Sequence, residues 1–173
     1  MTNPGWRRRV ARTALLVGEG GAEEQFLRHV KALYVRRGSG VVVTIKNARG
    51  KGAIHVIDVA IRLSRNAEYD VRAALLDTDT DWNDKARATA RKGRINVLPA
   101  DPCLEALLLQ IHRHPTAGRS TAQLKQDFAA HFGTGASATD VYHRHFTIDV
   151  LHEARSRLPL LEQLLTLMEM ARI

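Results

Sequence analysis

The sequence predicts an α/β protein: a central parallel sheet with helices on both faces, followed by a C-terminal helical extension. Short apolar runs rich in β-branched residues alternate with longer segments whose apolar residues recur at helical spacing. Such alternation is typical of strand–helix–strand units with parallel strands. Two of the runs, 13–18 and 71–77, are apolar almost throughout, as expected for central strands buried on both faces.

The first strand–helix unit begins with the run 13–18. A glycine-rich turn follows, and residues 22–37 have the apolar spacing of a helix that packs one face on a sheet. Gly38 is expected to end this helix, because glycine adopts the left-handed conformation common after a helix.

The second and third units repeat this order. The valine-rich run 41–46 predicts a strand, residues 47–52 a loop, and residues 53–65 an amphipathic helix. The run 71–77 predicts the third strand. Residues 84–92 predict a polar and weaker helix.

The fourth strand is expected at 94–99. Asp101 and Pro102 then predict a helix start, with Asp as the N-cap and Pro at the first helical position. The tail predicts a loop at 115–121, a helix at 123–132, a linker at 133–139, and helical structure from 148 that Pro159 interrupts. We therefore expect one domain at 13–114 and a helical extension at 115–173 packed on it.

The charge balance suggests a polyanionic partner. The chain has 173 residues, with 26 Lys and Arg against 18 Asp and Glu, and a net charge of +8. Its length fits one domain with a substantial core. The positive charge favours nucleic acid first and an anionic membrane surface second. Many basic proteins bind neither, so a simple solvated surface stays an alternative.

Cysteine usage and hydropathy give an expected location. Cys103 is the only cysteine, which leaves no intrachain disulfide and no zinc site built on cysteines. A reducing cytoplasm fits this composition. The apolar run 14–17 is too short for a signal-peptide core, and no segment is long enough to span a bilayer. We therefore expect a cytoplasmic protein without a membrane segment.

The first strand is expected to end in an acidic pair. Glu19 follows the run 13–18 directly, and Glu23 shares a helix face with the apolar residues Phe26 and Leu27. Ligands and catalytic groups gather at the carboxyl ends of parallel strands. We expect Glu19 and Glu23 to lie side by side there. A carboxylate favoured by the helix dipole is the simpler explanation for Glu19.

The third strand also ends in acids. Asp77, Asp79 and Asp81 alternate with other residues, so their side chains would point the same way if the chain stays extended. Like charges this close are tolerable when a divalent cation lies between them, and oxygen ligands suit Mg²⁺ or Mn²⁺. We predict all three as metal ligands. The alternative is an Asp-rich turn in which Asp81 and Asn83 cap the next helix.

Glu105 is a third acidic signal. It lies in the segment CLEALLLQI, which is otherwise apolar and predicts a buried helix. A lone acid in such a helix is usually paired or functional. Glu105 either pairs with an arginine such as Arg94 or joins the acidic pocket, and the sequence leaves both open.

Three basic residues are candidates for nucleic-acid contacts. Arg49 and Lys51 lie in the glycine-rich loop 47–52, and Arg113 follows the apolar helix. The loop is not a Walker A motif, because the spacing and the Ser/Thr are missing. Phosphate contacts and a solvated loop are equally compatible with it. The histidine-rich tail favours a basic, aromatic surface over a metal site.

Three motifs in order resemble a Toprim domain and, more closely, the RloB-like proteins. In that family an apolar strand ends in E-G-x-T-E, a later strand ends in D-x-D, and a Pro-Cys-aromatic-Glu segment opens an apolar helix. The matching residues are Glu19-Gly20-Gly21-Ala22-Glu23, Asp77-Thr78-Asp79 and Pro102-Cys103-Leu104-Glu105. The resemblance covers roughly 13–114. Ala22 and Leu104 depart from the usual threonine and aromatic residue.

The resemblance implies a Toprim-like fold and a nuclease that depends on Mg²⁺ or Mn²⁺. By the resemblance, Glu19 acts as general acid or base, and Asp77 with Asp79 holds metal. Glu23 and Glu105 would complete a second metal site. RloB-like proteins are associated with restriction and phage defence, which implies a DNA or RNA substrate and a partner ATPase or other defence protein.

Other functions stay open. A chain of 173 residues is too short to include an ATPase domain, so a non-catalytic nucleic-acid-binding or regulatory subunit is an alternative. Asp77 as a phosphoacceptor is less favoured, because Glu19 stands where that chemistry requires an acid pair. The apolar stripe in LLEQLLTLMEMA either forms a homodimer interface or folds back on the domain.

Overall fold

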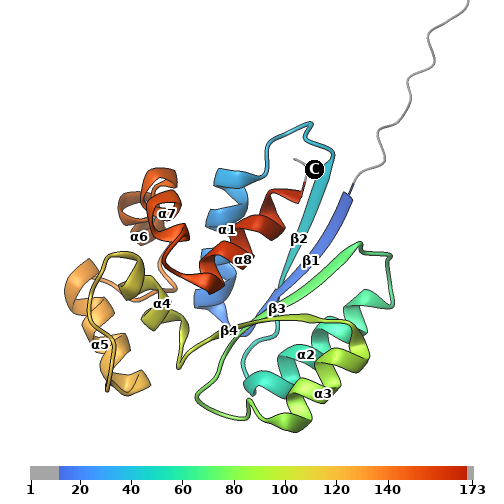
Figure 1. Ribbon diagram of the computed structural model, residues 1–173, viewed down its shortest axis with the longest axis horizontal. Coiled ribbons are helices and arrows are strands. Elements are labelled where there is room, and N and C mark those ends of the chain that lie inside the picture. The colour runs from blue at the N-terminus through green and yellow to red at the C-terminus, as the bar shows by residue number, and fades with distance from the viewer. Residues whose placement is uncertain (1–11, 171–173) are drawn as a thin grey trace, which may run out of the picture.

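The computed structural model describes residues 12–170 and confirms the α/β class (Figure 1). Its sheet has four parallel strands in the order β2-β1-β3-β4. The strands are β1 (Arg12–Gly18), β2 (Val41–Asn47), β3 (Val71–Asp77) and β4 (Asn96–Ala100). As predicted, the two most apolar strands, β1 and β3, occupy the centre, where helices cover both of their faces.

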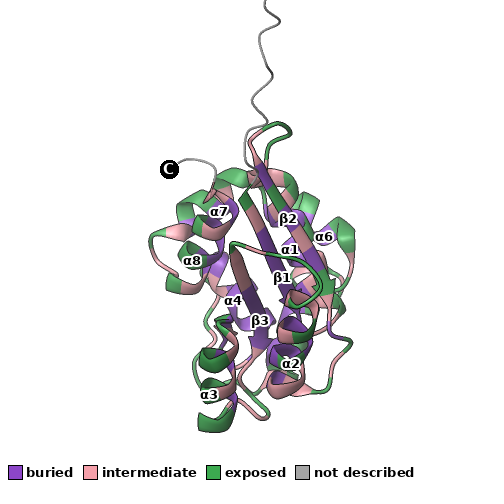
Figure 2. Ribbon diagram, turned by 90° about the vertical axis from the view of Figure 1, so that its right-hand side faces the viewer, coloured by how far each residue is buried: buried purple, intermediate pink, exposed green. Residues whose placement is uncertain are grey.

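Helices cover the two faces of the sheet in a Rossmann-like arrangement. One face carries α2 (Gly52–Ser64) and α3 (Asp84–Gly93), which lie below the sheet in Figure 1. The other face carries α1 (Gly21–Tyr34), α4 (Leu104–Ile111), α5 (Thr121–Phe132), α6 (Thr139–His145), α7 (Ile148–Arg155) and α8 (Pro159–Met168). Figure 2 shows the buried strands between these layers. Within residues 12–170, no helix is long and apolar enough to cross a bilayer.

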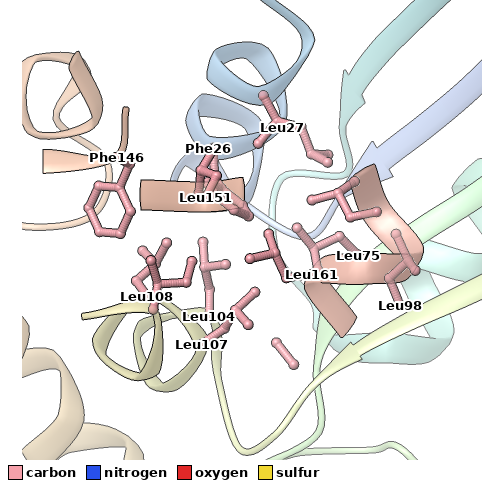
Figure 3. Packing of buried hydrophobic residues seen from close by; sticks show 14 of the residues in the cluster. Phe26, Leu27, Leu75, Leu98, Leu104, Leu107, Leu108, Phe146, Leu151 and Leu161 are labelled. Atoms are coloured by element: carbon pink, nitrogen blue, oxygen red, sulfur yellow. The ribbon is translucent and has the colours of Figure 1, made fainter. Parts of the chain in front are cut away.

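The larger of the two cores joins the domain and the C-terminal extension. Its side chains come from the sheet, from α1 and α4, and from the tail helices that pack over them (Figure 3). The labelled residues are Phe26, Leu27, Leu75, Leu98, Leu104, Leu107, Leu108, Phe146, Leu151 and Leu161. A smaller core lies between the sheet and the pair α2 and α3. Within the described residues, the extension at 115–170 is therefore packed on the domain through a shared apolar core.

The C-terminal apolar stripe folds back on the chain's own core. Leu161, Leu164, Leu165 and Met168 of α8 are buried in the larger cluster. These four side chains are covered within the chain itself, which favours the alternative that the stripe folds back on the domain. Pro159 occupies the first position of α8, where its missing amide hydrogen costs nothing.

Two local predictions are wrong. Asp101 does not cap α4: the N-cap is Cys103, and Asp101 Oδ1 instead accepts a hydrogen bond from the Thr78 hydroxyl (2.6 Å). The histidine-rich tail does not form an aromatic surface around Tyr142. That ring is buried in α6, and its hydroxyl donates to the carbonyl oxygen of Ala136 (2.5 Å).

Candidate functional site

Four carboxyl groups from four segments meet at one edge of the sheet. Glu19 follows β1, Asp77 ends β3, and Glu23 and Glu105 lie in the first turns of α1 and α4. The charges of the three glutamates raise the pKa of Asp77, so all four groups are within electrostatic reach. Glu23 and Glu105 are only 6% and 7% exposed. Glu105 thus joins the acids rather than pairing with Arg94.

The strand order explains why these acids meet. From β1 the chain adds β2 on one side, and it then adds β3 and β4 on the other. In open α/β sheets, ligands bind at the carboxyl ends of strands where the order reverses in this way. Glu19 and Asp77 stand at the ends of the two strands that flank this switch point. The Asp77 amide donates to Glu19 Oε2 (3.0 Å), which joins the two strand ends.

Backbone amides orient two further carboxyls. Gly18 lets α1 approach β1 closely, because a Cβ at this position would lie 2.8 Å from the Cβ of Glu23. Glu23 Oε2 accepts a hydrogen bond from the Gly20 amide (2.7 Å). Asp77 Oδ1 accepts one from the Leu104 amide at the start of α4 (3.0 Å). Each bond fixes one oxygen of its carboxyl and leaves the second oxygen outside it.

Burial and mutual repulsion raise the pKa values in this set. For Asp77, burial and then the three neighbouring carboxylates raise the pKa to about 8. Burial is also the main cause that raises the pKa of Glu23 and of Glu19. At neutral pH such a set holds protons or a cation, because several unneutralised charges repel one another at a half-buried edge.

Lys125 of α5 faces this set, and the sequence contained no signal for it. Partial burial lowers the pKa of Lys125, but the carboxylates of Glu105 and Asp77 raise it overall. One helical turn earlier, the Thr121 hydroxyl donates to Asp79 Oδ2 (2.7 Å), which fixes the start of α5 at this edge. Among residues 12–170, Lys125 forms no ion pair within 4.0 Å. It faces the carboxylates without neutralising them.

The three aspartates after β3 do not converge, contrary to the extended-chain prediction. The chain bends after Asp77, and each carboxylate turns toward a different helix start. Asp77 turns to α4, Asp79 to α5 and Asp81 to α2. Helix N-termini carry partial positive charge, so this separation lowers the repulsion that an extended chain would impose.

Asp81 is a structural residue rather than the predicted metal ligand. Its Oδ1 accepts a hydrogen bond from the Ala53 amide (2.5 Å) and its Oδ2 one from the Ile54 amide (3.3 Å), which caps α2. Gly52 has a φ of 82°, and a Cβ there would lie 2.6 Å from Asp81 Oδ1. Because both of its carboxylate oxygens accept α2 amides, we do not include Asp81 among the candidate metal ligands. Asn83 caps α3, as the alternative interpretation predicted.

We expect Asp81→Ala to lower the free energy of unfolding by about 1–2 kcal/mol, because α2 loses its cap. Urea denaturation measures this change. Asp84→Ala is the matched control, since the Asp84 side chain is fully exposed. Its ion pair with Arg87 contributes less than about 1 kcal/mol. Equal losses in the two variants would contradict the capping role.

Two of the three predicted nucleic-acid contacts lie at the acidic edge. The loop that carries Arg49 and Lys51 is tied to Glu19, whose carbonyl oxygen accepts a loop amide (2.7 Å). Both residues are exposed and have left-handed φ angles of 64° and 76°. Arg113 lies at the far end of α4, in an ion pair with Glu153 of α7. The nucleic-acid contact of Arg113 stays a prediction, and the residue lies away from the four carboxyls.

The carboxyls do not have the spacing of metal ligands as they lie. Within residues 12–170, no three Asp, Glu, His or Cys side chains are close enough together to hold a metal ion. Their chemistry nevertheless fits a hard divalent cation, because the donors are all oxygens. A cation would also offset the repulsion that raises the pKa of Asp77. A metal-bound form therefore requires carboxyl side chains to rotate toward a common point.

Comparisons with known proteins give no relative. No family model, curated protein or solved structure matches the chain. The resemblance to RloB-like proteins and to Toprim domains therefore stays a prediction from the motifs.

Proposed function

We propose that this protein is a divalent-metal-dependent nuclease that hydrolyses phosphodiester bonds in DNA or RNA. The observation that carries the proposal is the set of four carboxyls at the switch point of a parallel sheet, in a chain of net charge +8. Keeping these charges together at a half-buried edge is costly unless protons or a cation offset them. The resemblance to RloB-like proteins supports the same activity, in phage defence or restriction.

The proposed ligands of Mg²⁺ or Mn²⁺ are Asp77, Glu23 and Glu105. The bound cation would lower the pKa of a water molecule and offset the negative charge on the phosphate. Glu19 is only half-buried, and burial and then the charge of Asp79 raise its pKa. A carboxyl with a raised pKa is suited to accept and return a proton. Asp79 is exposed and acts on Glu19 only through its charge, so we do not include it among the proposed ligands.

Three basic side chains at this edge would offset the negative charge of a bound nucleic-acid backbone. Arg49 and Lys51 project from the loop tied to Glu19, and Lys125 faces the carboxyls from α5. Contacts between such cations and phosphates release counterions, so binding should weaken steeply as salt increases.

The purified protein should cut at least one substrate in a panel of plasmid, single-stranded DNA and structured RNA with Mg²⁺ or Mn²⁺. EDTA should stop the reaction. Asp77→Ala, purified in the same way, controls for a contaminating nuclease. Cleavage that the variant retains would contradict the proposal, as would the absence of cleavage with every metal and substrate.

A second candidate is a non-catalytic subunit that binds nucleic acid or regulates a partner ATPase or defence protein. The observation that favours it is that no three of these side chains have ligand spacing as they lie within residues 12–170. Under this alternative, binding to nucleic acid survives the double change Asp77→Asn and Asp79→Asn, and no metal induces cleavage.

We expect the metal-free protein to lose stability as the pH rises from about 4 to about 8. The pKa of Asp77 rises from 3.8 to about 8 on folding, so the folded protein holds a proton that the unfolded chain has released. This stabilisation is complete below the unfolded value and is lost as the pH passes through the folded one. Saturating Mg²⁺ replaces protons, so it should raise Tm more at pH 8 than at pH 6.

Thermal unfolding in EDTA and in Mg²⁺ tests this pH dependence. Asp77→Asn is the matched variant, because it removes the titrating group and should reduce both the pH effect and the metal effect. Equal Mg²⁺-induced shifts at pH 6 and pH 8 in the unmodified protein would contradict the proposed competition between metal and protons.

A further inference from the structure

A groove of about 290 Å³ lies between α3 and the edge strand β4. Trp82, Ala90, Ile95 and Val97 supply its apolar wall, and Asn96 lies at its β4 side. Trp82 comes five residues after Asp77, so the loop that leaves the acidic edge leads directly to the groove. Its position is fixed by its neighbour in the sequence, Asp81, which caps α2.

The rim of this groove is basic. Arg87 and Arg91 line it, and both residues are exposed. The Arg87 guanidinium lies 4.9 Å from the centroid of the Trp82 ring, in a cation–π contact. Only Ala86 and Ala90 of α3 are buried, so the charged side chains of this helix lie at the surface. The remaining cations of this segment are Lys85, Lys92 and Arg94.

We propose that this groove binds single-stranded nucleic acid, with one base against the Trp82–Arg87 pair and the adjoining phosphates on Arg91. An indole paired with a guanidinium presents flat surfaces on which a base can stack, and each stacked base typically contributes to affinity without sequence preference. Only two alanines of α3 are buried, so its cations are exposed. Arg87 pairs with Asp84, whereas Arg91 forms no ion pair among residues 12–170 and can contact a phosphate. A duplex keeps its bases stacked inside, so the groove favours single strands.

This inference rests on the proposed function, since it extends the path of a substrate whose scissile phosphate lies at the acidic edge. It adds a substrate class, single strands, and a second contact region remote from the loop of Arg49 and Lys51. An acidic peptide would match the charge but would not need the indole, so the experiment must separate base stacking from charge.

Fluorescence of Trp82 in EDTA provides the test. Trp6→Phe gives a background in which Trp82 is the chain's remaining tryptophan. The probes are oligo(dT), oligo(rU), an abasic oligonucleotide and a matched duplex. We expect both base-carrying single strands to quench the indole saturably, and the abasic strand and the duplex to quench it far less. Equal quenching by the abasic strand would overturn base stacking at Trp82.

Arg91→Gln and Lys92→Gln form the matched pair, because each removes one exposed cation of α3 and only Arg91 lines the groove. Arg91→Gln should weaken oligo(dT) binding by about tenfold, the loss expected for one charge-assisted contact. The slope of log K against log salt should fall by about 0.7. Lys92→Gln should change binding by less than about twofold. Equal effects of the two changes would overturn the assignment of this groove.

Failure of this proposal is distinguishable from failure of the nuclease proposal. Binding is measured without metal, and the Asp77→Asn variant should retain the quenching of Trp82. A protein that cleaves normally with no base-dependent quenching would contradict only the groove. A protein that shows the quenching but no cleavage would contradict only the nuclease.

Discussion

Asp77→Asn is expected to lower metal-dependent cleavage by at least about 10²-fold, a typical loss when one charge-stabilising group is removed from an active site. Asparagine keeps an oxygen that can accept the Leu104 amide, so the start of α4 should stay in place. The charge that makes Asp77 the centre of the repelling set is lost. The same variant should therefore be more stable than the unmodified protein at pH 8 in EDTA.

This combination of lost activity and gained stability separates a functional carboxylate from a structural one. Cleavage rates and thermal unfolding are measured on the same preparation. Asp81→Asn is the matched control: it removes an acid at the same edge, but an asparagine oxygen can still accept an α2 amide. We expect its cleavage to stay within about threefold of normal. Loss of stability in Asp77→Asn, or equal loss of cleavage in both variants, would contradict the assigned role.

Phe146→Ala is expected to lower the free energy of unfolding by about 3–5 kcal/mol, the range for a fully buried phenylalanine. Phe146 is 0% exposed, follows α6 and belongs to the larger core (Figure 3). Its ring packs edge-on against the His112 ring, with 4.9 Å between the ring centroids, and its centroid lies 5.5 Å from that of the Tyr142 ring. Its carbonyl oxygen contacts His29 Nε2 of α1 (2.6 Å).

Urea denaturation of Phe146→Ala beside Ile148→Ala measures this contribution. Ile148 lies two residues further on and is 45% exposed, so its truncation should cost less than about 1 kcal/mol. A large loss at Phe146 would show that the helical extension is part of the same cooperative unit as the sheet. A loss below about 1 kcal/mol, or a separate unfolding transition, would contradict a shared core.

The strands and the acidic edge were predictable because their signals are local. A short apolar run such as 71–77, set between helical segments, favours a central strand, and its last residue then stands at the carboxyl edge. Glu23 was predictable for a similar reason, since helical spacing places it on the buried face of α1. Glu105 followed from an acid in an otherwise apolar helix.

The predictions failed where the partner of a side chain lies far away in the sequence. Asp81 caps a helix 28 residues earlier in the chain, and no local pattern marks that partner. Asp79 is held by Thr121, 42 residues later. Lys125 faces the acids only because α5 packs beside α4. In the sequence pattern of its own helix, it looks like an ordinary solvent-exposed lysine. The spacing argument assumed an extended chain from Asp77 to Asp81. In the structure, each of the three aspartates instead accepts a hydrogen bond from the first turn of a different helix.

Equilibrium binding of Mn²⁺, followed by electron paramagnetic resonance of the free ion, tests the central claim most directly. The unmodified protein should bind Mn²⁺ saturably at pH 8, and Mg²⁺ should compete. Asp77→Asn and Glu105→Gln should each weaken binding by at least about tenfold, because each removes a charged ligand oxygen. Asp81→Asn should bind normally. Binding by the unmodified protein that is no tighter than that of Asp77→Asn would contradict a metal site at this edge.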